Sequence, residues 1–303
     1  MSETQTATQT ITPNIWSDGA AEEQAEFYAA TFRDCSFEIT GRYPEEGLPD
    51  FQKAMAGKPV TVDVSLAGTA LTIINAGPEF TPNPSINFML NFDPVLYSDA
   101  ADYLEQVHTA LSADGFVMME LGEYPFSPKY AWVQDRYGVS WQLILTNPEG
   151  GKRPFVLPSL MFCGPAQNKA REAVDSYIAL LPDSGWGTVA EYPEQTGPAP
   201  KGAIMFSEFR LAGQWFTAMD SGVEQPFSFT EGMSLMVAAH GQEEIDRLFA
   251  ALSTVPEAEQ CGWCKDSYGL SWQVVPDNMG ELMQRPGAHE HMMGMGKLII
   301  DDF

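Results

Sequence analysis

The sequence predicts an α+β protein built from two similar halves, each with two units of the order strand, helix, strand, strand, strand. The segment 135–142 (DRYGVSWQ) returns as 266–273 (DSYGLSWQ), with six identities in eight positions at an offset of 131 (266 − 135). A second match, between Leu66-Ala67-Gly68 and Leu211-Ala212-Gly213, has an offset of 145 (211 − 66). Between these matches, apolar residues recur at the strand period or at the helix period.

The first half begins with a predicted strand at 11–17, which Asp18-Gly19 ends. A helix at 20–32 follows, because Ala25, Tyr28 and Phe32 recur at helical spacing. The Ala67-Gly68 pair predicts a hairpin turn. The remaining elements are strands at 37–43, 60–66 and 69–75, and then a second unit with a strand at 86–92, a helix at 99–112 and strands at 116–121, 131–134 and 139–145.

The pattern restarts after a Gly- and Pro-rich stretch at 147–154, which we interpret as the boundary between the halves. The expected elements are strands at 155–162, 186–192, 203–211, 214–219 and 233–239, helices at 168–181 and 242–253, and the repeated closing strand. The tail 281–303 is expected to be a helix with a short extended end. The expected division is a disordered tail (1–10), a first domain (11–147), a linker (148–154) and a second domain with a C-terminal helix (155–303).

Composition excludes several classes of partner. The chain has 41 acidic and 16 basic residues, a net charge of −25, which repels phosphate backbones and anionic lipid surfaces. Nucleic acid and membranes are therefore not expected as partners. Its 4 cysteines are too few for a disulfide framework in 303 residues. The first nine residues lack the basic start and apolar stretch of a secretory signal, so a cytoplasmic location is expected.

The repeated segment predicts a turn followed by a half-buried strand. Side chains alternate along a strand, so Ser140 and Gln142 share one face and Trp141 lies on the other. We interpret Trp141 and Trp272 as core residues packed against a helix, with a ligand-stacking role as the alternative. The polar residues of both closing strands are candidate ligand contacts, with simple polar lining as the alternative: Ser140, Gln142, Ser271 and Gln273.

Two other clusters have a less favoured functional interpretation. Cys261 and Cys264 form a C-x-x-C motif, but in a strand they would lie on opposite faces about 10 Å apart, beyond disulfide reach. Redox or zinc chemistry is therefore the weaker interpretation. His289 and His291 with Met292, Met293 and Met295 could bind a soft metal, but a terminal helix that packs its methionines is favoured.

Several of these motifs resemble a known family. The opening segment 11–19 (ITPNIWSDG), the following Phe27-Tyr28, the segments 242–248 and 260–263, and the closing strands are similar to PhnB-like proteins, also described as the 3-demethylubiquinone-9 3-methyltransferase domain. These belong to the vicinal oxygen chelate superfamily, with glyoxalase I, extradiol dioxygenases and bleomycin-binding proteins. The resemblance covers both halves. It implies two tandem glyoxalase-like domains, in which paired βαβββ units form a curved, cup-shaped mixed sheet.

The resemblance also indicates where a site would lie. Enzymes of the superfamily hold a divalent metal in the cup with His or Gln from the first strand of each unit and Glu from the last. The first-strand positions fall on Pro13 and Pro158, which have no donor atom, and Asn87 and Ser234 lie near the start of the other two units. The last-strand positions fall on Gln142 and Gln273. The residues therefore predict no metal, and no other cofactor is expected, since no Gly-rich turn for S-adenosylmethionine is visible.

We therefore expect a metal-free protein that binds a small organic molecule. The candidate contacts are Ser140, Gln142, Ser271, Gln273, Asn87 and Ser234. The alternative is a metal-dependent lyase, isomerase or dioxygenase with a site that the sequence does not mark. Because tandem copies can pair with each other inside one chain, we expect a monomer with an internal pseudo-dimer, with a homodimer as the alternative.

Overall fold

The computed structural model describes residues 9–46, 48, 50–147, 149 and 151–303. The first half contains two units. Unit 1 consists of β1 (Ile11–Ser17), α1 (Ala21–Thr31), β2 (Cys35–Arg42), the 3-10 helix η1 (Asp50–Met55), β3 (Pro59–Leu66) and β4 (Thr69–Asn75). Unit 2 consists of β5 (Ile86–Phe92), α2 (Ala100–Ser112), β6 (Phe116–Tyr124), β7 (Ser127–Gln134) and β8 (Ser140–Leu145).

The second half repeats this order. Unit 3 consists of β9 (Val156–Phe162), η2 (Gly164–Ala166), α3 (Ala170–Leu180), β10 (Gly185–Glu191), β11 (Ile204–Leu211) and β12 (Gln214–Asp220). Unit 4 consists of β13 (Met233–Ala239), α4 (Gly241–Leu252), η3 (Pro256–Ala258), β14 (Trp263–Lys265) and β15 (Ser271–Pro276). The chain ends with α5 (Met279–Leu282), α6 (Ala288–Met293) and η4 (Ile300–Asp302).

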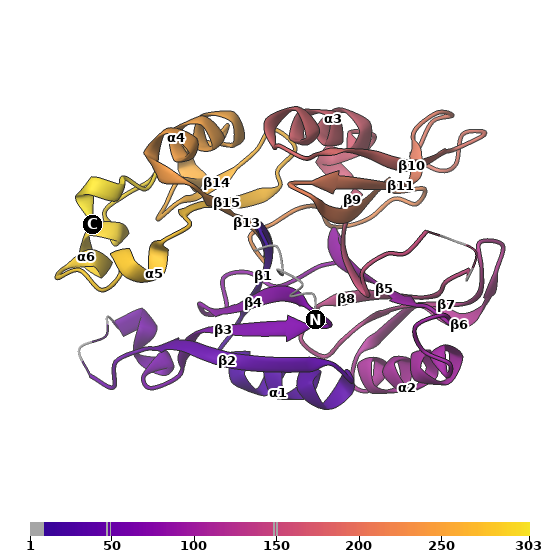
Figure 1. The fold of residues 1–303 in the computed structure, drawn as a ribbon, viewed down its shortest axis with the longest axis horizontal. Helices are drawn as coiled ribbons and strands as arrows, with labels where there is room; N and C mark the ends of the chain where they lie inside the picture. The colour runs from indigo at the N-terminus through magenta and orange to yellow at the C-terminus, as the bar shows by residue number, and fades with distance from the viewer. Residues whose placement is uncertain (1–8, 47, 49, 148, 150) are drawn as a thin grey trace, which may run out of the picture.

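The four units pair into two sheets, and each sheet combines one unit from each half. Sheet A has the order β14-β15-β13-β1-β4-β3-β2, from units 4 and 1, and sheet B has the order β10-β11-β12-β9-β5-β8-β7-β6, from units 3 and 2. The units join through antiparallel pairs, β1 with β13 and β5 with β9. In Figure 1 the strands lie between α1 and α2 on the lower side and α3 and α4 on the upper side. The predicted α+β class with paired βαβββ units is confirmed, but the units pair between the halves and not within each half.

A buried carboxylate joins the two units of each half. Asp135, in the turn between β7 and β8, accepts hydrogen bonds on Oδ2 from the Tyr28 hydroxyl of α1 (2.8 Å) and from Trp141 Nε1 (2.9 Å). Its Oδ1 accepts the backbone N–H groups of residues 137 and 139, which fixes the turn. Asp266 makes the same set of bonds in the second half. The buried carboxylates therefore join the two units within each half, whereas each sheet is built from one unit of each half.

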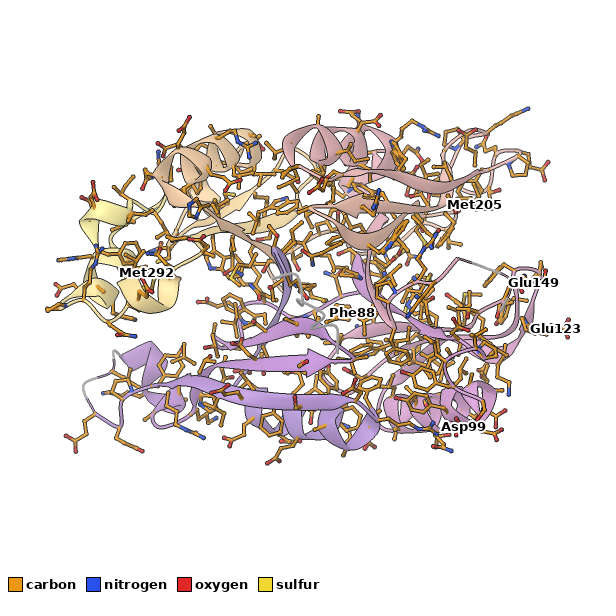
Figure 2. All side chains as sticks on the ribbon, viewed as in Figure 1. Phe88, Asp99, Glu123, Glu149, Met205 and Met292 are labelled. Atoms are coloured by element: carbon orange, nitrogen blue, oxygen red, sulfur yellow. The ribbon has the colours of Figure 1, made fainter. Side chains whose placement is uncertain are left out.

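The two repeated tryptophans belong to the core. Trp141 in β8 and Trp272 in β15 are 0% and 1% exposed, and both lie in the main apolar cluster between sheets and helices. Trp141 packs against Phe88, which Figure 2 labels near the centre of the molecule, with ring centroids 5.0 Å apart. The core interpretation of these tryptophans is confirmed, and they occupy corresponding strands, as the repeat predicts.

The prediction that the C-terminal segment forms one helix followed by an extended end is wrong. Two short helices form instead, because Gly287, after Pro286, adopts a positive φ of 82° between them. Met292 and Met295 pack, together with Met279 and Met283, against a small cluster around Leu282 and Leu298, as expected, whereas Met293 is 46% exposed. Figure 2 labels Met292 at this end of the molecule, beside sheet A.

The predicted tail and linker lie partly outside the described residues, which exclude 1–8, 148 and 150. Gln9 is bonded to β4: its Nε2 donates to the Ala70 carbonyl, and the Ala70 N–H donates to its Oε1, each at 2.8 Å. In the linker, Arg153 binds Glu208 of β11. Among the helices of the described chain, none is long and apolar enough to cross a bilayer.

Candidate ligand-binding site

Four polar side chains meet on the concave face of sheet A. Asn14 of β1 lies opposite Ser234 of β13 and beside Thr72 of β4 in the strand register, so the three share one face. Gln273 of β15 joins them, because its Nε2 donates to Ser234 Oγ at 2.9 Å. We call these residues the sheet A quartet. The neighbouring Ile15 points to the other face and is fully buried in the core.

Sheet B carries an equivalent set, the sheet B quartet. Ser159 of β9 lies opposite Asn87 of β5 and beside Thr217 of β12. Gln142 of β8 completes the set, since its Nε2 donates to Asn87 Oδ1 at 2.8 Å. All four residues are at most 2% exposed. The two quartets occupy corresponding places in the two cups, so the internal repeat has duplicated this arrangement.

The predicted first-strand positions are wrong by one residue. Pro13 pairs with Leu235 and Pro158 pairs with Phe88, both core residues, so the prolines lie on the helix-facing side. A shift of one residue along a strand moves a side chain to the opposite face. Asn14 and Ser159 therefore occupy the concave positions. The sequence prediction missed Asn14 and Ser159. The offset of 145 between the Leu-Ala-Gly turns could have indicated them, because it also separates Asn14 from Ser159 and Thr72 from Thr217.

The structure brings the predicted site residues together in pairs. Gln142 binds Asn87, and Gln273 binds Ser234, across neighbouring parallel strands. In sheet B, the Tyr130 hydroxyl also donates to Gln142 Oε1 at 2.7 Å. The remaining two candidates are the serines of the closing strands: Ser140 accepts a bond from Trp132 Nε1 at 2.7 Å, and Ser271 is buried two residues before Gln273.

Unpaired buried polar atoms concentrate in the quartets. Both polar side-chain atoms of Asn14, the Ser159 hydroxyl and the Thr217 hydroxyl have no hydrogen-bond partner among the described residues. Among the other described residues, only Asn75 Oδ1 and His108 Nε2 are buried polar atoms without a hydrogen-bond partner. Leaving a buried polar group unpaired costs about 1–3 kcal/mol. These atoms therefore have unused hydrogen-bonding capacity beside each cup.

A cavity of about 280 Å³ lies on the concave side of sheet B. Met89 and Ile144, which line it, come two residues after Asn87 and Gln142 on the same strands and the same face. Glu208, also in the lining, lies opposite Thr217 in the register. The cavity therefore begins one row of side chains beyond the quartet. Its lining is completed by Asn91, Asp93, Phe126, Leu145, Thr146, Asn147, Gly151, Arg153, Thr188 and Phe206.

An ion pair forms the polar wall of this cavity. Arg153 Nε and Nη2 donate to the two carboxylate oxygens of Glu208, each at 2.9 Å. The side chains are 24% and 15% exposed, and the guanidinium carbon lies 4.0 Å from the centroid of the Trp215 ring. Such a two-bond pair satisfies both charges in a fixed geometry. The pair is therefore polar without net charge, while the Asp93 carboxylate adds a negative charge to the lining.

The remaining space of each cup is filled differently. In sheet B, Tyr130, Trp132, Met161 and Cys163 pack together beside the quartet, with Tyr130 opposite Ile144 and Trp132 opposite Gln142. In sheet A, the residues corresponding to Met161 and Trp132 are Trp16 and Trp263, whose ring centroids are 6.1 Å apart. At the end of sheet A that corresponds to the cavity, Val275 packs against the C-terminal cluster instead.

The quartets do not fit the metal site of the superfamily's enzymes. Each supplies only amide and hydroxyl groups, whereas zinc and related metals prefer imidazole, thiolate or carboxylate ligands. Among the described residues, no three His, Cys, Asp or Glu side chains group closely enough to hold an ion. The C-x-x-C motif does not add a thiolate readily, since burial raises the pKa of Cys264 to about 12.

The four βαβββ units pair into two cups, and each cup has a polar quartet on its concave face. This architecture defines a glyoxalase-like protein. The sequence matches the family described as 3-demethylubiquinone-9 3-methyltransferase over residues 9–144 and again over 154–275, so the chain belongs to this family. The resemblance inferred from the motifs is confirmed.

Two solved structures are similar to this chain. A protein of Bacillus cereus, described as a 3-demethylubiquinone-9 3-methyltransferase and PhnB protein, is 31% identical, with 46% of this chain and 100% of that chain covered and a TM-score of 0.40. Glyoxalase I of Zea mays is 10% identical, covers 89% of this chain and 95% of its own, and has a TM-score of 0.52, which shows a shared fold. A search of curated protein sequences found no match.

Proposed function

We propose that this protein binds a small, uncharged organic molecule in the cup of sheet B without the help of a metal. The observation that supports this proposal is the pair of buried, unpartnered hydroxyls of Ser159 and Thr217, which lie one row of side chains from a cavity. Ligand sites in proteins commonly combine an apolar cavity with a few convergent polar groups. A ligand that reached these hydroxyls would satisfy both of them.

The charges around the cavity disfavour an anionic ligand. Arg153 is already bound to Glu208, and Asp93 adds a second carboxylate to the lining. The net charge of −25 further disfavours anions. The quartet itself is neutral and can both donate and accept hydrogen bonds through its amides and hydroxyls.

Sheet B is a better candidate than sheet A. In sheet A the corresponding end of the cup holds Val275, which packs against the C-terminal cluster. Asn14 still presents an unpaired amide there. We therefore expect one strong site per chain, in sheet B, and at most a weaker one in sheet A.

The test is a thermal-shift screen of uncharged metabolites in the presence of EDTA, followed by Thr217→Val. Ligands that bind the native state raise its melting temperature by mass action. We expect at least one such ligand, with unchanged affinity when EDTA is omitted. Thr217→Val removes an unpaired hydroxyl at nearly constant shape, so it should weaken ligand binding without lowering the melting temperature of the free protein.

Thr72→Val is the matched control, because Thr72 holds the corresponding position in sheet A. Its hydroxyl donates to Asp63 at 2.7 Å, so the variant should lose a little stability and keep full binding in sheet B. The proposal fails if freshly purified protein contains a stoichiometric metal whose removal abolishes binding. That result would favour the metal-dependent lyase, isomerase or dioxygenase instead.

A further inference from the structure

We infer that the sheet B cavity selects a planar aromatic molecule, an inference that rests on the proposed function and specifies its ligand class. Two phenylalanines line the cavity from opposite ends of the same sheet. Phe126 belongs to the connection between β6 and β7, at one edge of sheet B, and Phe206 belongs to β11, next to the other edge. Figure 1 shows these segments on opposite sides of the cup, at the lower and upper right.

Phe126 has the features of a preformed stacking surface. It is 60% exposed and lines the cavity. The Phe126 ring stacks on Tyr124 with centroids 5.7 Å apart and meets Tyr130 edge-on at 5.0 Å. Tyr130 is itself fixed by its bond to Gln142. These contacts orient the exposed ring before any ligand arrives, and a rigid aromatic surface loses little freedom on binding.

The floor and the size of the cavity suit a flat ligand. Met89 and Ile144 lie between the two phenylalanines on the central strands, and a thioether makes favourable contacts with aromatic rings. The volume of about 280 Å³ lies just below the range for ligand cavities, about 300–1,000 Å³. A molecule of one or two fused rings is therefore the expected size.

Polar groups also line the sheet B cavity. Arg153 uses three of its N–H groups, two on Glu208 and one on the Lys152 carbonyl at 3.1 Å, and has further N–H groups for a ring acceptor. The hydroxyls of Ser159 and Thr217 lie outside the lining, one row of side chains away. The inferred ligand is therefore an uncharged aromatic or heteroaromatic compound with a hydrogen-bonding group on its ring edge.

The test compares two probes that differ in aromaticity: 2-naphthol and its saturated analogue decahydro-2-naphthol. Titration calorimetry of the whole chain should show 2-naphthol binding roughly three- to ten-fold more tightly, because ring stacking adds to simple apolar burial. Phe126→Ala should remove most of that preference and leave the affinity for the saturated probe nearly unchanged. Phe126→Leu, which keeps apolar area without a ring, should behave in the same way.

Phe116→Ala is the matched control. Phe116 is 65% exposed on β6 and does not line this cavity, so its removal should leave both affinities unchanged. If both probes bind equally and Phe126→Ala has no effect, the aromatic class is wrong while binding in the cup stands. If neither probe binds, the inference is also refuted, and the metabolite screen with Thr217→Val decides separately whether the cup binds any molecule.

Discussion

Replacing the glutamine of each quartet with alanine should destabilise the two cups unequally. Gln142 is 2% exposed and bridges two buried groups, the Tyr130 hydroxyl and Asn87 Oδ1. Gln142→Ala therefore leaves both groups without their partner. In Gln273→Ala the bond that is lost leads to Ser234, whose hydroxyl can rotate toward another acceptor. The two variants remove the same side-chain atoms from corresponding strands, so their difference isolates the hydrogen bonds.

The expected loss follows from the groups left unpaired. Each buried polar group without a partner costs about 1–3 kcal/mol, so Gln142→Ala should lower the free energy of unfolding by about 2–5 kcal/mol. Gln273→Ala should cost about 1 kcal/mol for its single bond. Any cost of the cavity left by truncation enters both values and largely cancels in the comparison.

Urea unfolding followed by tryptophan fluorescence measures both losses. Similar slopes with denaturant for the two variants would show that the unfolded reference is unchanged. Equal losses, or a larger loss for Gln273→Ala, would refute the reasoning, because they would mean that the Tyr130–Gln142–Asn87 bonds contribute little. Tyr130→Phe then provides a check, since it removes the hydroxyl together with its bond and should cost less than Gln142→Ala.

Three further predictions concern the rest of the chain. Burial raises the pKa of Asp135 to about 6, above its ordinary value of 3.8, so the unfolded chain ionises first as the pH rises. The contribution of this group to the free energy of unfolding is therefore fully present below about pH 4 and is lost toward pH 6, at up to about 1.4 kcal/mol per pH unit. Asp135→Asn should flatten this part of the pH profile in urea unfolding, and an unchanged slope would contradict the assignment. Arg153→Gln should lower the free energy of unfolding by about 1–3 kcal/mol in thermal or urea unfolding, because it leaves the half-buried Glu208 unpaired. Adding Glu208→Gln should recover part of that loss, and additive losses in the double variant would argue against the ion pair. Light scattering at micromolar concentration should find a monomer, because both inter-unit strand pairs form within one chain, and a stable dimer would overturn this expectation.

The sequence by itself determined the units and their internal order. The turn and strand of 135–142 and 266–273 could be recognised because Asp, Gly and alternating polar and apolar residues act locally, within a few positions of each other. The same alternation placed Trp141 and Trp272 in the core and put the glutamines on the opposite face. Family membership also followed from short motifs of this kind.

Tertiary structure alone decided which units share a sheet and which residues meet in each cup. Pairing of β1 with β13 and of β5 with β9 depends on contacts between residues far apart in the chain, which local periodicity does not encode. Alternation defines two faces of a first strand but does not say which one meets the helices. For this reason the prediction at Pro13 is wrong by one residue, and Asn14 lies on the concave face. The cavity likewise needs Arg153 from the linker and Phe126 and Phe206 from opposite ends of sheet B, which only the curvature of the sheet brings together.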